Sequence, residues 1–471
     1  MPTVWAIRFM GIALIFLEDF SMNKIKNLSE TNFMRLFYAF ITACFLIGAL
    51  CMPDRADMLD GLWRIITSPA KISTNYFALG GYAATFLNMG FVALISLLLF
   101  SQRGVVINAG STLAFLLTTG FGSWGINVLN VWPSILGVVL YCVLKKDSPA
   151  KQANAMLYST GIAPLISDLM LRYPGDAVGF TPVGVVISLG VGLVIGLCLP
   201  AGMTFSPKVH KGFDLYSAAL PIGMMAFFLQ AVLFKTMGVT LPSAPSADTL
   251  QVANSTIVNV FCLCVFCSCV IFALILGCRP KDYWELLKDP DQVTNFAARY
   301  GNATFLMNAG LFGLMILAYY NAIGATFNGI TFGIIFCMLA CCNSGSHPAN
   351  VWPIMAGYLV FSYLFGWLSN LAGGNFAGQI NAQAIMVGLC YANGLSPIAD
   401  RYGWGYGMLA SGMHYLLVTS VPALHGGFCL YNGGFTAALI CLILVPQMEQ
   451  FLHTKPERKL ARAARKVAKN G

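Results

Sequence analysis

The chain contains the same pattern twice. Asn-Val-Trp-Pro at 130–133 returns at 350–353, and Ala-Thr-Phe-Leu at 84–87 returns at 303–306, about 220 residues further on. A long repeat inside a very apolar chain is typical of secondary transporters, whose binding sites lie between the two copies. The duplication therefore predicts two related halves around a shared centre.

The composition predicts an all-α integral membrane protein. Hydrophobic residues make up 58% of the chain, charged residues make up 10%, and the mean hydropathy is +0.73. Soluble domains carry about 25% charged residues. Apolar runs of about 20 residues can cross a bilayer as helices, whereas transmembrane barrels show short alternating strands.

These runs predict about 14 transmembrane helices, arranged as two inverted seven-helix repeats that include broken or half helices. The first repeat gives runs at 33–52, 77–101, 104–121, 126–144, 154–171, 180–200 and 213–235. The second gives runs at 255–278, 301–320, 323–342, 351–370, 378–395, 404–421 and 427–448.

Loop charges set the expected orientation. Basic residues cluster at 24–35, 145–151, 208–211 and 279–288, and again in the C-terminal tail. With the N-terminus in the cytoplasm, all five clusters fall on the cytoplasmic side, as the positive-inside rule requires. Three basic residues fall on the outside and count against this orientation, namely Arg55, Arg64 and Lys71. An odd number of helices per repeat then inverts the second copy, and both termini lie in the cytoplasm.

Five segments follow from this topology. They are an N-terminal interfacial segment (1–30), the first membrane repeat (31–236), an extracytoplasmic linker (237–254), the second, inverted repeat (255–450) and a basic cytoplasmic tail (451–471). The run 5–17 is interpreted as an amphipathic helix at the membrane surface, with an additional span as the alternative. Glu18 and Asp19 stand where a signal peptide would need small residues for cleavage.

The tail carries most of the net charge. From Lys455 onward it holds seven basic residues and one acid, so it supplies +6 of the chain's +9. A helix of this composition can bind anionic lipid headgroups, and the alternative is a solvated tail that holds the C-terminus in the cytoplasm. Nucleic-acid binding is not expected, because the basic run lacks interleaved aromatic residues.

Matched helix breaks in the two halves mark the expected site. A break inside a bilayer must be buried in protein or line a wet cavity, because lipid cannot satisfy the free backbone groups. The first pair of breaks lies at 120–127 and 340–348. The candidate substrate-binding residues around it are Asn108, Asn130, Asn328, Asn343, His347 and Asn350. The alternative is that they are helix caps and turns without contact to a solute.

Two further pairs of breaks carry titratable groups. Asp168 and Arg172 follow a proline in the first half, and Asp400 and Arg401 follow one in the second. His425 opens a glycine-rich stretch near the C-terminal end. These five residues are candidates for gating or proton coupling, since ionisable groups in a membrane are costly and tend to be functional. The alternatives are interfacial salt bridges and a structural histidine.

Catalytic and metal chemistry are not expected. Most of the 15 cysteines lie in apolar runs, where cysteine packs as a small hydrophobe. The chain has no paired carboxylates, nucleophile elbow, metalloprotease helix motif or phosphate-binding loop. We therefore expect neither an enzyme nor an ATP-driven pump, and no cofactor beyond coupling to H⁺ or Na⁺. The expected partners are the lipid bilayer, a small-molecule solute and a second copy in a homodimer.

The glycine-rich segment also carries a resemblance. His-Gly-Gly-Phe-Cys-Leu-Tyr-Asn-Gly-Gly-Phe-Thr at 425–436 resembles a family of uncharacterised bacterial multi-span membrane proteins. The resemblance implies a bacterial cytoplasmic membrane and no particular substrate. The seven-plus-seven inverted topology is similar to the nucleobase and anion transporter architecture, in which the third and tenth spans are half helices. Urea channels are also inverted repeats, although with five spans in each half.

The predicted function is a secondary transporter or facilitator for a small polar or anionic solute, working by alternating access. The alternatives are a passive channel-like permease, a membrane-embedded lipid-handling enzyme, and a receptor or scaffold that transports nothing. The absence of a sizeable soluble domain argues against the last of these.

Overall fold

The computed structural model describes residues 25, 28–175, 177–240, 254–289 and 291–470. The interfacial segment expected at 1–30, including the run 5–17, lies almost wholly outside these residues, and so does most of the linker 237–254. All regular structure in the described residues is helical, without a strand.

The helices of the first half are α3 (Glu30–Cys51), α4 (Met58–Ile66), α5 (Tyr76–Gly80), α6 (Tyr82–Phe100), α7 (Ala109–Phe121), α8 (Trp132–Lys145), α9 (Ala153–Tyr158), α10 (Ala163–Arg172), α11 (Pro182–His210) and α12 (Ala219–Gln230). Those of the second half are α13 (Ser255–Ile275), α14 (Pro280–Leu286), α15 (Phe296–Tyr300), α16 (Asn302–Ala322), α17 (Gly329–Leu339), α18 (Pro348–Leu371), α19 (Gln383–Ala392), α20 (Ser396–Tyr402), α21 (Trp404–Val418), α22 (Val421–Leu424), α23 (Asn432–Phe451) and α24 (Lys455–Asn470). The short turns η3 (Ser159–Ile162), η6 (Ala340–Asn343) and η7 (Asn393–Leu395) connect helices, and the π-helical turn η4 (Ala231–Thr236) extends α12.

Eight helical segments in the described part of the chain are long and apolar enough to cross a membrane. They are α3, α6, α11, α12 with η4, α13, α16, α18 and the segment 432–465. Three shorter apolar helices, α7, α8 and α17 with η6, accompany them. These lengths support an all-helical, multi-span membrane protein.

The other six of the 14 expected spans correspond to shorter helices. A continuous helix at 154–171 is replaced by α9, η3 and α10, and one at 378–395 by α19 and η7, which α20 follows. Pro164 and Pro397 stand in the first turns of α10 and α20. Proline has no N–H to continue a preceding helix, so it begins a new one.

The two halves repeat the same local structures. Asn75 caps α5 and Asn295 caps α15, and both short helices end at a glycine with φ +87°, Gly81 and Gly301. Asn108 and Asn328 each form a capping box at the start of α7 and α17, with Ser111 and Thr331 as the partner residues. A capping box satisfies two backbone N–H groups at the start of a helix.

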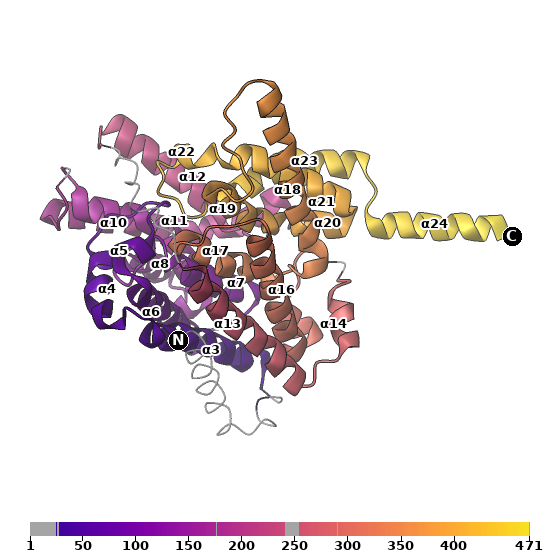
Figure 1. The fold of residues 1–471 in the computed structure, drawn as a ribbon, viewed down its shortest axis with the longest axis horizontal. Helices are drawn as coiled ribbons and strands as arrows, with labels where there is room; N and C mark the ends of the chain where they lie inside the picture. The colour runs from indigo at the N-terminus through magenta and orange to yellow at the C-terminus, as the bar shows by residue number, and fades with distance from the viewer. Residues whose placement is uncertain (1–24, 26–27, 176, 241–253, 290, 471) are drawn as a thin grey trace.

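The helices α7 and α17 pack against each other near the centre of the molecule (Figure 1), and contacts at both ends show that they run in opposite directions. Ser123, just beyond the end of α7, donates its hydroxyl to the carbonyl of Gly329 at the start of α17 (2.6 Å). Asn343, at the end of η6, donates to the hydroxyl of Thr112 in the first turn of α7 (3.3 Å). Where the helices cross, a methyl group on Gly333 would lie 2.4 Å from the Gly120 carbonyl oxygen. The contact therefore requires glycine.

Small residues also allow other helix pairs to pack closely. A Cβ on Gly196 of α11 would lie 2.1 Å from the Ser134 carbonyl of α8, and one on Gly357 of α18 would lie 2.0 Å from the Ser411 hydroxyl of α21. Helix association in a membrane depends on such close packing, because lipid supplies no hydrophobic drive between helices. Helix α24 is different, since it extends away from the body and carries the C-terminus at its far end (Figure 1).

Candidate functional site

The breaks after α7 and α17 are each held by one buried asparagine from a neighbouring helix. The Asn88 amide nitrogen in α6 donates to the carbonyls of Gly122 (2.7 Å) and Ile126 (2.8 Å). The Asn308 amide nitrogen in α16 donates to the carbonyls of Cys342 (2.8 Å) and Ser346 (3.0 Å). Each amide thus satisfies backbone groups that the helix break has left free.

The repeat in the sequence did not reveal Asn88 and Asn308 as an equivalent pair, because the alignment of the two copies shifts by one residue near them. The repeated Ala-Thr-Phe-Leu aligns residue 84 with residue 303, whereas the equivalent structural pairs, Gly81 with Gly301 and Asn88 with Asn308, lie one residue further apart. An alignment on the capping residues Asn75 and Asn295 would have found the pair.

Asn130 and Asn350 close the turn before α8 and the first turn of α18 with the same bonds. The side-chain oxygen of Asn130 accepts from the N–H of Asn127 (2.8 Å), and that of Asn350 accepts from the N–H of His347 (3.0 Å). The Asn130 amide nitrogen donates to the Gly125 carbonyl (2.9 Å) and to the Ser167 hydroxyl (2.8 Å).

The Asn350 amide nitrogen donates to the Gly345 carbonyl (2.8 Å) and to the Asp400 carboxylate. Both asparagines are buried, and both donors of each are used within the protein. A solute that binds either amide must therefore replace one of these bonds in another conformation.

The remaining asparagine candidates lie at the helix ends. Asn343 accepts from the N–H of Ala297 (2.9 Å) as well as donating to Thr112. Asn328 is buried and donates to Gln383 (2.6 Å), whereas Asn108 is exposed. Because α7 and α17 are antiparallel, these two capping residues stand at opposite ends of the crossed pair.

The loops that lead into α12 and α23 exchange contacts between the halves. The N–H of Leu215 donates to the Gly394 carbonyl (3.0 Å), and the N–H of Leu430 donates to the Gly161 carbonyl (2.9 Å). A tyrosine follows each leucine, and its ring lies against the same glycine, Tyr216 on Gly394 and Tyr431 on Gly161. Each half therefore holds one loop of the other.

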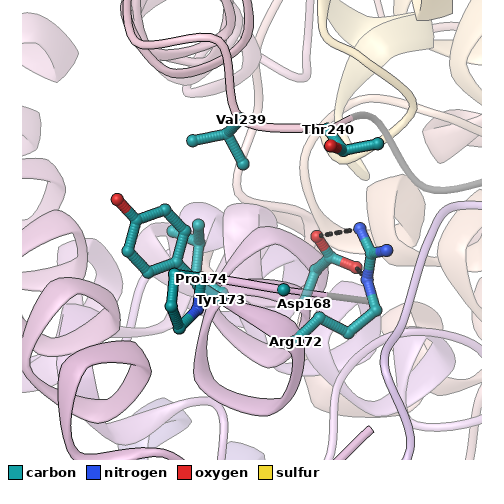
Figure 2. Close-up of a pocket in the computed structure, with 8 residues that line it drawn as sticks. Asp168, Arg172, Tyr173, Pro174, Val239 and Thr240 are labelled. Carbon is teal, nitrogen blue, oxygen red and sulfur yellow. Dashed lines mark hydrogen bonds and ion pairs between the residues drawn. The ribbon is translucent and has the colours of Figure 1, made fainter. Parts of the chain in front are cut away.

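An open pocket lies at the C-terminal end of α10 (Figure 2). It has a volume of about 160 Å³ and is partly open to solvent. Arg172 donates to both carboxylate oxygens of Asp168, at 2.7 and 3.0 Å, and this pair faces Val239 and Thr240 across the pocket (Figure 2). The pocket is lined by Asp168, Leu169, Arg172, Tyr173, Pro174, Gly175, Val239 and Thr240.

The loop lysine Lys71 acts on this pocket through its charge. Burial lowers the pKa of Lys71, and the Asp168 carboxylate partly offsets that change. The first expected Asp–Arg pair is thus present, and it lines an open pocket.

The second expected pair is arranged differently. Asp400 of α20 accepts the hydrogen bond from Asn350 and lies 4.0 Å from the Nε2 atom of His347, whereas Arg401 is partly exposed. The structure thus brings together three predicted residues, His347, Asn350 and Asp400. His425 lies elsewhere, buried with its ring edge-on to Phe435 (5.2 Å between ring centroids).

Possible metal ligands and thiols are both present among the described residues. There, no three His, Cys, Asp or Glu side chains come together as a metal site requires. The cysteines are free thiols, and most of them are buried.

Comparison with known proteins gives one result. A family model described as a protein of unknown function (DUF1576) matches residues 54–235 and 279–450, one segment in each half of the chain. No curated protein and no solved structure matches the chain.

Proposed function

The chain belongs to the DUF1576 family of unknown function, and from that premise we propose that it is a secondary transporter or facilitator that moves a small polar or anionic solute by alternating access. The proposed architecture is two inverted seven-helix repeats in a bacterial cytoplasmic membrane, with both termini in the cytoplasm. The relatives supply no activity, so the proposal depends on the geometry of the chain.

One observation carries the proposal, the antiparallel crossing of α7 and α17. These helices hold the same place in the two halves, since each begins at an asparagine capping box and ends at a break held by an asparagine from the preceding long helix. Equivalent helices that run in opposite directions are what two inverted repeats produce. The asparagine caps at their ends then place polar groups toward opposite faces of the membrane.

The exchanged loops support motion of one half against the other. The contacts of Leu215 with Gly394 and of Leu430 with Gly161 are equivalent, with hydrogen bonds of almost equal length. A pair of equivalent contacts lets one open while the other stays closed. Alternating access requires such an exchange between two states of similar free energy.

Two other functions remain as alternatives. A passive channel-like permease would share the repeats. It would not alternate between a state closed on one side of the membrane and a state closed on the other. A membrane-embedded lipid-handling enzyme would need a nucleophile and a base held together in a pocket open to lipid. The crossing of two equivalent helices favours transport, because catalytic groups seldom occur as symmetric pairs.

The test has two steps: a binding screen that identifies the solute, and a measurement of the uptake of that solute. A ligand that binds the folded protein raises its stability by about 2.7 kcal/mol at 100 times Kd, so a thermal-shift screen of small metabolites detects it. Uptake of that solute into proteoliposomes is then measured. We expect Asn130→Ala and Asn350→Ala each to abolish uptake.

Asn88→Ala and Asn308→Ala are the matched controls. They also remove a buried amide that bonds two loop carbonyls, which costs about 1–3 kcal/mol each, but they are not placed against the solute. We expect these controls to lower the melting temperature and keep uptake in the folded fraction. Full uptake by the Asn130→Ala, Asn350→Ala double variant would reject the site.

A further inference from the structure

One polar turn differs in charge between the two halves. In the first half, the turn before α8 is built by Asn127, Asn130 and Ser167, which are all neutral. In the second half, the same bonds are made by His347, Asn350 and Asp400. A titratable pair thus replaces an asparagine and a serine in one repeat only.

The imidazole ring of His347 is buried, although the backbone of the residue is hydrogen-bonded. Its exposed fraction is 0%, and within the described residues neither ring nitrogen makes a hydrogen bond. The closest acidic group is the Asp400 carboxylate, whose Oδ2 atom lies 4.0 Å from Nε2. Burying two imidazole nitrogens without partners costs free energy, because each nitrogen loses its hydrogen bond to water and gains none in the protein. A proton on the imidazole would place a positive charge beside the Asp400 carboxylate.

The charged groups around the pair come from three other elements. Lys455 at the start of α24 interacts electrostatically with both His347 and Asp400. Asp289, before α15, interacts with Asp400, and it is itself bonded to Arg299 and Tyr300. Arg458 holds the start of α24 in place by donating to the Tyr402 carbonyl.

These contacts suggest two protonation states for the pair of His347 and Asp400. A buried ionised carboxylate is stable only when a counter-charge or hydrogen bonds compensate it. When a proton occupies the pair, the net charge of His347 and Asp400 is zero. When the proton leaves, the pair carries one negative charge, and the charge of Lys455 acts on Asp400 to offset it.

We propose that His347 and Asp400 form a proton-binding site, which holds one proton on either the imidazole or the carboxyl group and releases it to water at the face where α24 begins. Lys455 then takes the place of the proton as the counter-charge of Asp400. No bond other than that to the proton forms or breaks. As a coupling site it depends on the proposed transport function, but proton binding itself is measurable without any solute.

The test is pH-difference infrared spectroscopy of the full chain reconstituted in lipid. A protonated carboxyl group has a C=O stretch that an ionised one lacks, so the wild type should show a band that titrates between about pH 5 and 8. Asp400→Asn and Asp400→Ser should each lose that band. The serine variant restores the residue that the first half carries at this position, Ser167, and the fold already accommodates it there.

His347→Asn separates a shared proton from a proton on the carboxyl alone. It also restores a first-half residue, Asn127. With the imidazole gone, the proton resides only on Asp400, so the band should become larger or change its midpoint pH. His453→Gln and Asp282→Asn, which alter an exposed imidazole and a partly exposed carboxylate paired with Arg279, should leave the band unchanged.

Three results would overturn the proposal. The first is a titrating band that survives in both Asp400 variants, and the second is the absence of such a band in the wild type. The third is a His347→Asn spectrum identical to that of the wild type, which would place the proton on the carboxyl alone. Failure of solute uptake, in contrast, would overturn the transport function and leave the proton site as measured.

Discussion

At the residue scale, equivalent residues in the two halves have different surroundings. The same substitution made in each half can therefore be compared. Gly81 and Gly301 have nearly the same backbone angles, with φ +87° and ψ of 176° and 158°. Only glycine adopts this region readily. A methyl group on Gly301 would meet open space, whereas one on Gly81 would lie 2.3 Å from the Asp54 carboxylate.

This difference predicts unequal costs for the same substitution. Gly301→Ala should lower the free energy of unfolding by about 1–3 kcal/mol, the cost of the strained backbone alone. Gly81→Ala should cost more, because Asp54 also accepts from the N–H groups of Tyr82 (2.7 Å) and Ala83 (3.0 Å) and would be displaced. Denaturant unfolding in detergent measures both values, and equal losses would contradict this account.

Single residues were predictable where the repeat preserved both type and register. Asn130 and Asn350 were found because they stand in an identical tetrapeptide. Asn88 and Asn308 were hidden by a shift of one residue. The contact of His347 with Asp400 could not be predicted, because it depends on how α18 and α20 fold back on each other. No local pattern encodes that distance.

At the scale of elements, α24 has a surface with no partner in the described chain. Leu460 is 71% exposed, and helical spacing puts it on the face opposite the basic residues Arg458, Arg462 and Arg465. Such a helix can lie on an anionic membrane with its apolar face toward the lipid. Its first turn is fixed to α20 by Arg458, so lipid binding would orient the whole helix.

We expect α24 to enter the membrane interface only when anionic lipid is present. A spin label at Leu460→Cys, with the exposed Cys198 replaced by serine, reports its depth in nanodiscs of phosphatidylcholine with or without phosphatidylglycerol. Arg462→Gln with Arg465→Gln should weaken the anionic-lipid effect by about 2 kcal/mol, roughly 30-fold, at about 1 kcal/mol per charge. Equal label depth in both lipids would instead support a solvated tail.

The elements themselves were largely predictable, and their lengths were not. Apolar runs located the long helices because burial in lipid and in protein both require apolar side chains. The same runs overestimated continuity. Pro164 divides the run 154–171, and the run 378–395 contains α19 and the turn η7, with Pro397 beginning α20 beyond its end. An apolar run does not show how many helices it contains. Proline removes a backbone hydrogen bond and interrupts a helix, and this effect does not change the hydrophobicity of the run.

At the scale of the whole molecule, the account depends on the two halves having opposite orientations in the membrane. Three features support transport only if the halves are inverted. They are the antiparallel pair α7 and α17, the exchanged loops, and the polar turn that is neutral in one half and charged in the other. A parallel duplication would put both asparagine caps, Asn108 and Asn328, toward the same face. It would leave no reason for a shared central path.

Cysteine accessibility from the two sides of the membrane tests the inversion most directly. Gln102, just after α6, and Ala322, at the end of α16, are equivalent positions, and both are exposed. In intact right-side-out vesicles, with Cys198 replaced by serine, a membrane-impermeant maleimide should modify Ala322→Cys at once. It should modify Gln102→Cys only after the vesicles are permeabilised. Modification of both from the same side would contradict the inverted repeat and, with it, the proposed transport site.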